Sequence, residues 1–287
     1  MIKVILLTKN EHDLIERFIQ YYGAHVGLEN IRIIDNGSTL ESVLDVYKKY
    51  KVEVIFDDFS FDMATVCTKM TKYMEELDCD WILPVETDEF VIFDDLKKTL
   101  ENVDEKCSTV LFKVFDSCVD VNDSSYKDGQ YEDPVINITN FVPTQTDKFI
   151  VRKKHFRKMT FWLHQVETSG YKVNSFIPLI HFCNTGKKRA AEKAKSVISN
   201  KGVVGKNGIV TIDFSHNVKE QLLLYYKKPI VNGHKINILY DFLMDVPEKE
   251  MPNDVLKYTK IQGFFKTVLP NPQFQTGEDH LAIKELL

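Results

Sequence analysis

Three carboxylates interrupt an apolar stretch of the sequence, and their types and spacing suit a cation site. Residues 81–85 are short and apolar, as expected of a buried strand, and Glu86, Asp88 and Glu89 follow directly. Because alternate side chains of an extended chain point the same way, Glu86 and Asp88 are expected to project together. Two adjacent carboxylates at the end of a buried strand repel each other unless a positive charge lies between them, and a divalent cation would supply it. The alternative is a surface turn with solvated acids, but apolar residues on both sides favour the cation site.

The elements before this stretch alternate between strand and helix. Apolar runs at 2–8, 31–35 and 52–56 predict strands, and apolar residues at helical spacing predict the helices between them. Ser38 and Glu41 are expected to form a capping box on the second helix. This alternation predicts a mostly parallel sheet with helices on both faces, which binds ligands at the carboxyl ends of its strands. Those ends carry Thr8-Lys9-Asn10-Glu11, Asp35-Asn36-Gly37-Ser38, Asp57-Asp58 and Glu86-Thr87-Asp88.

The alternation stops after residue 95. The later strands are expected to form a more mixed edge, and they lie at 109–115, 149–152, 159–166 and 177–183. A polar loop is expected from 116 to 131, a basic helix from 187 to 200, and two or three amphipathic helices beyond 215. We therefore expect one domain in residues 1–200 and a C-terminal helical extension in residues 201–287, packed on the same domain.

Charge and composition exclude several classes of protein. A net charge of -5 and a pI near 5.9 argue against a nucleic-acid binder, which normally carries a basic face. No window of the sequence approaches the length of a membrane span, and the apolar start at 1–7 is too short for a signal peptide. The cysteines lack C-x-x-C spacing, so we interpret them as reduced thiols of a cytoplasmic protein and not as a disulfide framework or zinc site. They are Cys67, Cys79, Cys107, Cys118 and Cys183.

Several motifs occur in a family-like order. They are the strand ends already named, Asp80-Trp81, Glu86-Thr87-Asp88-Glu89-Phe90, Lys148-Phe149-Ile150-Val151-Arg152, Trp162-Leu163-His164 and Pro178-Leu179-Ile180-His181-Phe182. In this combination the chain resembles GT-A fold glycosyltransferases of the family 2 type, in the subgroup whose metal motif is followed by Glu-Phe. The resemblance covers residues 1–200. It extends to the compact glycosyltransferases encoded by large algal viruses, which would place a viral protein in the host cytoplasm.

The resemblance implies a nucleotide-sugar donor and a divalent metal, manganese or magnesium. A cation of this kind stabilises the charge that gathers on a diphosphate leaving group, and hard oxygen ligands suit it. By the resemblance, Asp88 binds the metal directly, and His181 reaches back to the metal or the diphosphate. Glu86 stands where the family commonly has Asp, so it either binds the metal through water or contacts the donor ribose.

The resemblance also suggests residues for the donor and the acceptor. Asp35 resembles the acid that contacts the nucleoside, with Thr8 lining the base, although Asp35 could equally form an Asx turn before Gly37. The remaining donor-site candidates are Asn10, Glu11, Thr87, Arg152 and Lys187; a solvated basic face would explain Lys187 equally well. His164 is a candidate catalytic residue at the donor or acceptor, with packing beside aromatics as its alternative. Asp116 is the first choice for the catalytic base, and the rivals on the same loop are Asp120, Asp123, Glu132 and Asp133.

These features predict a metal-dependent glycosyltransferase of glycan or glycoprotein biosynthesis. It would move a hexosyl or pentosyl group from a UDP-sugar, with GDP less favoured, to a hydroxyl of a glycan acceptor, and inversion is the family default. A sugar-1-phosphate nucleotidyltransferase would need a Gly-rich loop after the first strand, which the motif at 8–11 lacks. A catalytically inactive nucleotide-sugar-binding module is the other alternative, suggested by Glu86. The late helices could cap the acceptor site, form a homodimer contact or dock on a partner enzyme.

Overall fold

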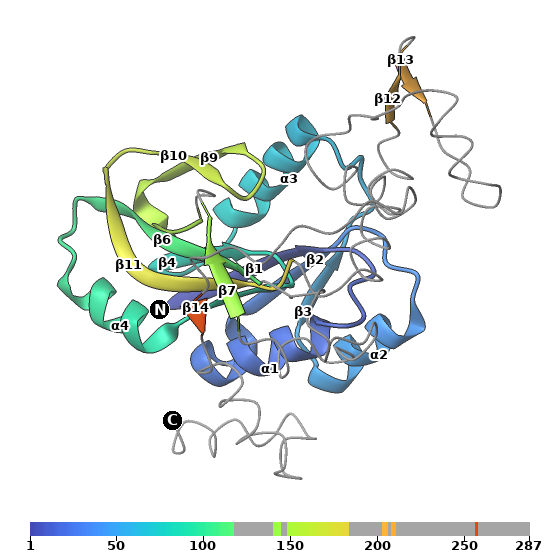
Figure 1. Cartoon of the computed structure of the whole chain (residues 1–287), viewed down its shortest axis with the longest axis horizontal. Coiled ribbons are helices and arrows are strands. Elements are labelled where there is room, and N and C mark those ends of the chain that lie inside the picture. Colours follow the sequence, from blue (N-terminus) through green and yellow to red (C-terminus); the bar gives the residue numbers. More distant parts are fainter. Residues whose placement is uncertain (118–139, 145–147, 184–202, 206–207, 211–255, 258–287) are drawn as a thin grey trace.

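The computed structural model describes residues 1–117, 140–144, 148–183, 203–205, 208–210 and 256–257. Within these residues a ten-stranded mixed sheet forms the centre of the molecule, in the order β14-β7-β6-β8-β4-β1-β2-β3, with β11 and β5 joined beside β6 (Figure 1). The first strands are β1 (Ile2–Thr8), β2 (Ile31–Asp35), β3 (Glu53–Phe56) and β4 (Trp81–Val85).

These four strands are parallel, and their carboxyl ends meet at one edge. Thr8 pairs with Asp35, Asp35 with Phe56, and Leu6 with Val85. The predicted α/β class, with a mostly parallel region covered by helices, is confirmed. The polar residues that follow the strands are therefore brought to a common edge, as expected of such a sheet.

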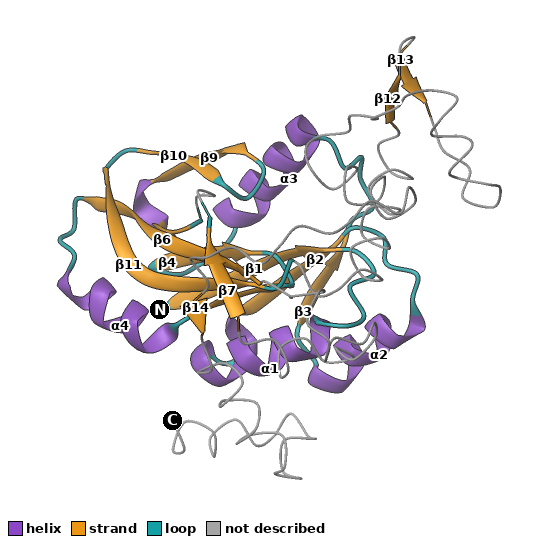
Figure 2. Ribbon diagram, viewed as in Figure 1, coloured by secondary structure: helices purple, strands orange, loops and turns teal. Residues whose placement is uncertain are grey.

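The helices cover both faces of the sheet (Figure 2). They are α1 (Ile15–Val26), α2 (Glu41–Tyr50), α3 (Met63–Glu75) and α4 (Phe93–Asn102), with short 3-10 turns at Leu28–Asn30 and Lys153–His155. Successive residues of β1 alternate between two buried cores: Leu6 packs in the core that includes α1 and α2, and Ile5 packs in the core that includes α3. Both faces are apolar because both are buried.

The start of α2 differs from the prediction. Leu40 is the N-cap of this helix and makes no side-chain capping bond, so the expected capping box of Ser38 and Glu41 does not form. Asn10 caps it from another loop: its side-chain oxygen accepts hydrogen bonds from the backbone N–H groups of Thr39 (2.8 Å) and Leu40 (3.1 Å). The Asn10 amide thus binds the N–H groups of the N-cap residue and of the residue before it, which are not the two that the capping box would have bonded.

The later strands extend the sheet with mixed directions. They are β5 (Glu89–Val91), β6 (Cys107–Ser117), β7 (Asn140–Pro143), β8 (Phe149–Arg152) and β11 (Tyr171–His181). Strand β11 runs parallel to β6 and antiparallel to β5, and its register sets His181 opposite both Asp116 and Glu89. Asp116, expected to open a loop, lies inside β6.

Two further expectations need correction. The strand expected over 159–166 is a hairpin of β9 (Phe156–Phe161) and β10 (Gln165–Thr168), broken at Trp162, whose φ of 45° a strand cannot contain. In the C-terminal region the structure describes a short hairpin of β12 (Val203–Gly205) and β13 (Gly208–Val210), and β14 (Leu256–Lys257) on the edge of β7. The expected helices at 187–200 and beyond 215 otherwise lie outside the described residues. No described helix is long and apolar enough to cross a membrane.

Candidate active site

The acidic turn after β4 is held against the end of β11. Glu86, Thr87 and Asp88 connect β4 to β5, and the backbone N–H of Phe182 donates to the carbonyl oxygen of Asp88 at 2.8 Å. This bond continues the pairing of β5 with β11, so the turn does not swing freely in solvent. Asp88 is 5% exposed, which excludes the solvated surface turn for this residue.

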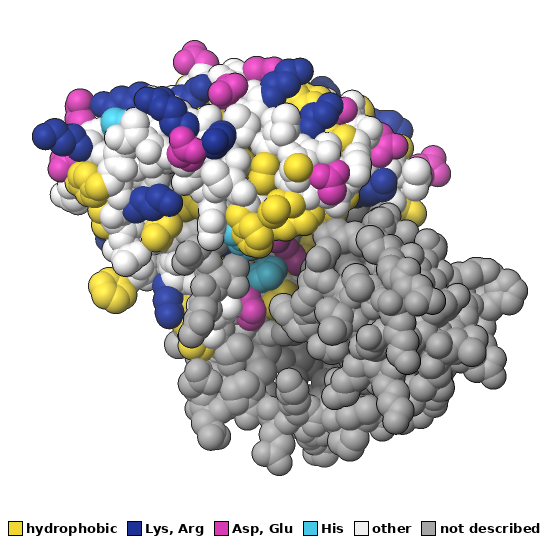
Figure 3. Space-filling view, turned by 90° about the horizontal axis from the view of Figure 1, so that it is seen from above, with side chains coloured by type: hydrophobic (Ala, Val, Ile, Leu, Met, Phe, Trp, Pro, Cys, Tyr) yellow, Lys and Arg dark blue, Asp and Glu magenta, His cyan; other side chains and the backbone are white. Residues whose placement is uncertain are grey.

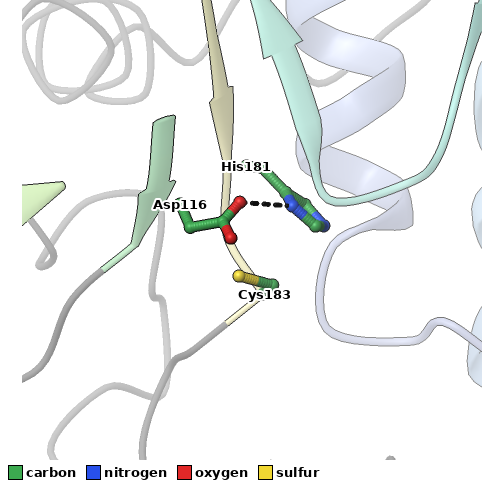
Figure 4. A group of neighbouring side chains, drawn as sticks. All are labelled: Asp116, His181 and Cys183. Carbon is green, nitrogen blue, oxygen red and sulfur yellow. Dashed lines mark hydrogen bonds and ion pairs between the residues drawn. The ribbon is translucent and has the colours of Figure 1, made fainter. Parts of the chain in front are cut away.

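His181 lies between two carboxylates, and Figure 4 shows it beside one of them, Asp116. Its Nδ1 is 2.9 Å from Oδ1 of Asp116, and its Nε2 is 3.6 Å from Oδ1 of Asp88. Burial lowers the pKa of His181, but the charge of Asp88 and the bond to Asp116 outweigh that effect and hold the pKa well above its ordinary value of 6.5. The imidazole therefore carries a positive charge between the two acids.

A buried lysine balances the other carboxylates of the turn. Lys148 is 1% exposed, and its Nζ lies 2.8 Å from Oε1 of Glu89 and 3.6 Å from Oε2 of Glu86. Burial lowers the pKa of Lys148, but the two carboxylates raise it by more than burial lowers it. The pKa of Lys148 is therefore above its ordinary value. Burial also raises the pKa of Glu89, which is fully buried, and Lys148 opposes that rise. Lys148 was not among the predicted site residues; its only signal was a charge directly before the apolar strand at 149–152.

Glu86 is the most accessible acid of the turn. Its side chain is 42% exposed, and its backbone N–H donates to Oε2 of Glu89 at 2.9 Å. Lys148 lowers the pKa of Glu86 to about 2, against burial and the charge of Asp88. The positive charge expected between the carboxylates is thus supplied, within the described residues, by Lys148 and His181.

The donor set near His181 fits a divalent ion. Two ligands at right angles on an ion with bonds of about 2.1 Å lie about 3.0 Å apart, and Asp88 Oδ1 and His181 Nε2 are 3.6 Å apart. Among the described residues, Glu86, Glu89 and His181 also bring one ligand atom each within 4.8 Å of one another, as do Asp116, His181 and Cys183. Glu86 and Glu89 both lie beside Lys148, at 3.6 Å and 2.8 Å, and Asp88 and His181 are the pair whose spacing fits the ion.

The remaining predicted residues at this edge make internal contacts. Thr87 donates through its hydroxyl to that of Thr8 at 3.0 Å, and both are buried. Asp35 is fully buried and accepts from the backbone N–H of Ser38 (2.6 Å) and the hydroxyl of Tyr47 (2.8 Å). The bond to Ser38 spans three residues, one more than the Asx turn offered as the alternative for Asp35.

Asn10 and Glu11 lie at the same edge, in the loop that leads into α1. Asn10 caps α2, and the carbonyl oxygen of Glu11 accepts from the backbone N–H of Ile15 at 3.1 Å. His164 lies in the link between β9 and β10, where its backbone N–H donates to the carbonyl of Phe161 at 2.9 Å.

One described residue among those predicted does not join the cluster, and another lies outside the described residues. Arg152 pairs with Trp81 at the opposite end of β4, where its guanidinium lies 4.3 Å from the Trp81 ring centre and donates to the carbonyl oxygens of Cys107 (3.0 Å) and Asp104 (3.0 Å). Lys187 lies outside the described residues.

The face seen from above in Figure 3 shows the surroundings of the edge. Histidine and acidic side chains emerge beside a group of hydrophobic ones. Exposed aromatic side chains of the hairpin and of the loop before α3 include Phe161 (44%) and Phe61 (41%), and the Phe61 ring contacts that of Trp162 at 5.1 Å. Charged and aromatic groups are thus both available in this part of the molecule.

No model of a known protein family and no curated protein matches the chain. Among solved structures, the chain is similar to S. aureus TarS 1-349 in complex with UDP-GlcNAc, with a TM-score of 0.41, 12% identity, and coverage of 84% of this chain and 71% of that one. It is also similar to HddC from Yersinia pseudotuberculosis, with a TM-score of 0.38, 12% identity, and coverage of 63% and 93%.

A third similar structure is glucosyl-3-phosphoglycerate synthase from Mycobacterium tuberculosis, with a TM-score of 0.30, 17% identity, and coverage of 40% of this chain and 44% of that one. The chain spans 66% of the TarS 1-349 structure without a named ligand and 40% of a longer TarS structure. At these TM-scores and identities, the similarities establish neither the activity nor the ligands of this chain.

Proposed function

We propose that this protein is a glycosyltransferase of the GT-A type that moves a sugar from a UDP-sugar to a hydroxyl of a glycan acceptor, with manganese or magnesium as cofactor. One observation carries the proposal: Asp88 and Asp116 flank His181 at the carboxyl ends of the strands, at 3.6 Å and 2.9 Å. Ligands bind at this edge in open α/β sheets. The cluster therefore stands where an activated sugar would be expected.

Different residues at this edge have different proposed roles in binding. Asp88 and His181, with Glu86 beside them, would hold the cation, whose chemistry as a Lewis acid is to stabilise charge on the diphosphate. Lys148 keeps the turn in place, because it neutralises Glu89 and Glu86. Thr8 and Thr87 line the buried floor of the same edge.

Asp116 is the proposed catalytic base. Its side chain is 27% exposed, so an acceptor hydroxyl can reach it. As the hydroxyl oxygen bonds to the anomeric carbon and the bond to the diphosphate breaks, the hydroxyl proton passes to the Asp116 carboxylate. His181 orients that carboxylate through the 2.9 Å contact, and the transfer proceeds with inversion if attack comes from the face opposite the diphosphate.

An inactive nucleotide-sugar-binding module is the second candidate. It is favoured by one observation: Lys148 and His181 already neutralise the acidic turn, so the residues need no metal to remain charged and buried. Such a module would bind the donor through the same edge but would not turn it over.

Hydrolysis and transfer with a panel of UDP-sugars, with and without manganese, test the proposal. Manganese-dependent turnover is expected in the wild type and loss of turnover in Asp88→Asn. Asp45→Asn is the matched control, because Asp45 is a 59% exposed acid on α2, and it should keep wild-type turnover. Donor binding without turnover in every combination would support the inactive module, and absence of nucleotide binding would refute both.

A further inference from the structure

A thiol lies beside the two groups that the proposed reaction uses, and the proposed function does not employ it. We propose that Asp116, His181 and Cys183 form a binding site for a borderline-soft transition-metal ion of the zinc class. One ligand atom of each residue lies within 4.8 Å of the others, and Figure 4 shows the three side chains pointing toward one another. Together they offer an oxygen, a nitrogen and a sulfur donor.

The strand geometry explains how the thiol reaches the site. Cys183 stands two positions after His181, and alternate side chains of an extended chain lie on the same side. Phe182 between them is fully buried, with its ring 5.5 Å from those of Phe90 and Phe141. This packing turns Phe182 into the core and leaves its two neighbours to face Asp116, which β6 presents opposite His181.

The distances are close to those of a tetrahedral site. Zinc bonds of about 2.0–2.3 Å to oxygen, nitrogen and sulfur place the donors about 3.4–3.6 Å apart. The contact of 2.9 Å between Asp116 and His181 must therefore open by about 0.5–0.7 Å, and the thiol must approach by about 1.2 Å or less from the 4.8 Å limit. Small side-chain rotations suffice, and Asp116 and His181, which are 27% and 21% exposed, remain reachable from solvent.

The chemistry of the donors selects the ion. A thiolate favours zinc and cobalt over magnesium, and three protein ligands leave a fourth position for water. On binding, the thiol proton and the Nδ1 proton of His181 pass to solvent, Nδ1 ligates the ion, and the remaining ring proton sits on Nε2. Asp88 lies 3.6 Å from that nitrogen and would act as the outer carboxylate that orients a metal-bound histidine.

The other three-residue group within the described part of the chain is less suited. It combines Glu86 and Glu89 with His181, and Lys148 already sits 2.8 Å from Glu89. An ion there would have to displace a buried ammonium group. The site with Cys183 does not face that obstacle, and its test needs no transferase activity. An ion bound there would occupy Asp116 and His181, so it would exclude their roles in the proposed transfer.

Cobalt titration of the full chain, stripped of metal with a chelator, tests the site without any nucleotide sugar. The wild type should show the near-ultraviolet absorption of a thiolate–cobalt bond. Cys183→Ser should lose this absorption and bind cobalt at least about tenfold more weakly, since even outer-shell losses cost about 10- to 100-fold. Cys79→Ser, which changes a free, partly exposed cysteine elsewhere, should retain both.

Asp116→Asn provides a second, independent variant, expected to weaken cobalt binding while the sulfur absorption persists at saturation. Circular dichroism and thermal unfolding confirm that each variant is folded. Cobalt binding without the thiolate absorption in the wild type, an unchanged spectrum in Cys183→Ser, or no binding at all would overturn the assignment. Each of these results is independent of the outcome of the UDP-sugar assay.

Discussion

Replacement of Lys148 by methionine should destabilise the protein far more than loss of a surface lysine. At 2.8 Å, the attraction between Lys148 and Glu89 is about 6 kcal/mol with an effective dielectric constant of about 20, and it offsets the cost of burying both ions, which is several kcal/mol each. Lys148→Met leaves the fully buried Glu89 carboxylate without its counter-charge. Breaking a buried pair in this way costs about 3–5 kcal/mol.

The assay is urea unfolding of the full chain at pH 7, followed by tryptophan fluorescence. Lys154→Met is the matched control: that side chain is 50% exposed and pairs with Glu105 at 3.2 Å, so its loss should cost less than about 1 kcal/mol. The double variant Lys148→Met, Glu89→Gln should recover at least half of the loss, because the buried charge is removed from both sides. Glu86 can remain charged in it, since 42% of its side chain is exposed.

The pH dependence supplies a further check on the reasoning. Without Lys148, the buried Glu89 carboxyl must take up a proton to fold, so its pKa in the folded state lies further above the ordinary value of 4.5. A group whose pKa is raised on folding stabilises below its unfolded value and loses that contribution as the pH rises. The gap between Lys148→Met and the wild type should therefore shrink toward pH 4.5. A loss no larger than that of Lys154→Met, with no pH dependence, would refute the pairing.

Two other predictions concern the loop contacts and the histidine. Asn10→Ala should lower the free energy of unfolding by about 1–2 kcal/mol in the same urea assay, because α2 loses its cap; an unchanged midpoint would contradict this role. His181 should stay protonated above pH 6.5 in the metal-free protein, as read from its ring nitrogen NMR shifts. The protonated ring contributes fully to the free energy of unfolding below pH 6.5, and this contribution is lost as the pH rises through the raised pKa of His181. His181→Asn should therefore remove this pH dependence from the free energy of unfolding. Titration of the His181 ring near pH 6.5 would contradict the raised pKa.

Much of the first half of the fold could be predicted because each element carries its own pattern. Apolar runs bounded by polar residues gave the strands from Ile2–Thr8 to Trp81–Val85, and their parallel order follows from the helices between them. Local signals were less reliable where a distant residue competes: Ser38 and Glu41 suggested a capping box, but Asn10 supplies the cap. The prediction of one strand across Trp162 was wrong, because the positive φ of Trp162 breaks this segment into the two strands of a hairpin.

The acidic turn was predictable, but its partners were not. Carboxylates at the end of an apolar strand require positive charge whatever the fold, and Glu86, Asp88 and the late histidine could be chosen on that ground and by family resemblance. The sequence around Lys148 does not predict its burial, because the residues that follow it have the pattern of an ordinary strand. Arg152 shows the converse: it was chosen from the same motif, but the antiparallel direction of β8 carries it to the far end of β4.

Periodicity and desolvation act on neighbouring residues, so the amino-acid pattern alone predicts the alternation of elements, the α/β class and a charged turn that needs compensation. The identity of the compensating charges follows from tertiary contacts. The register of β11 between β5 and β6 places His181 beside Asp88 and Asp116, and the path of the chain into β8 buries Lys148 against Glu89. Such contacts join residues far apart in the chain, and strand pairing and burial select them after the local patterns have formed.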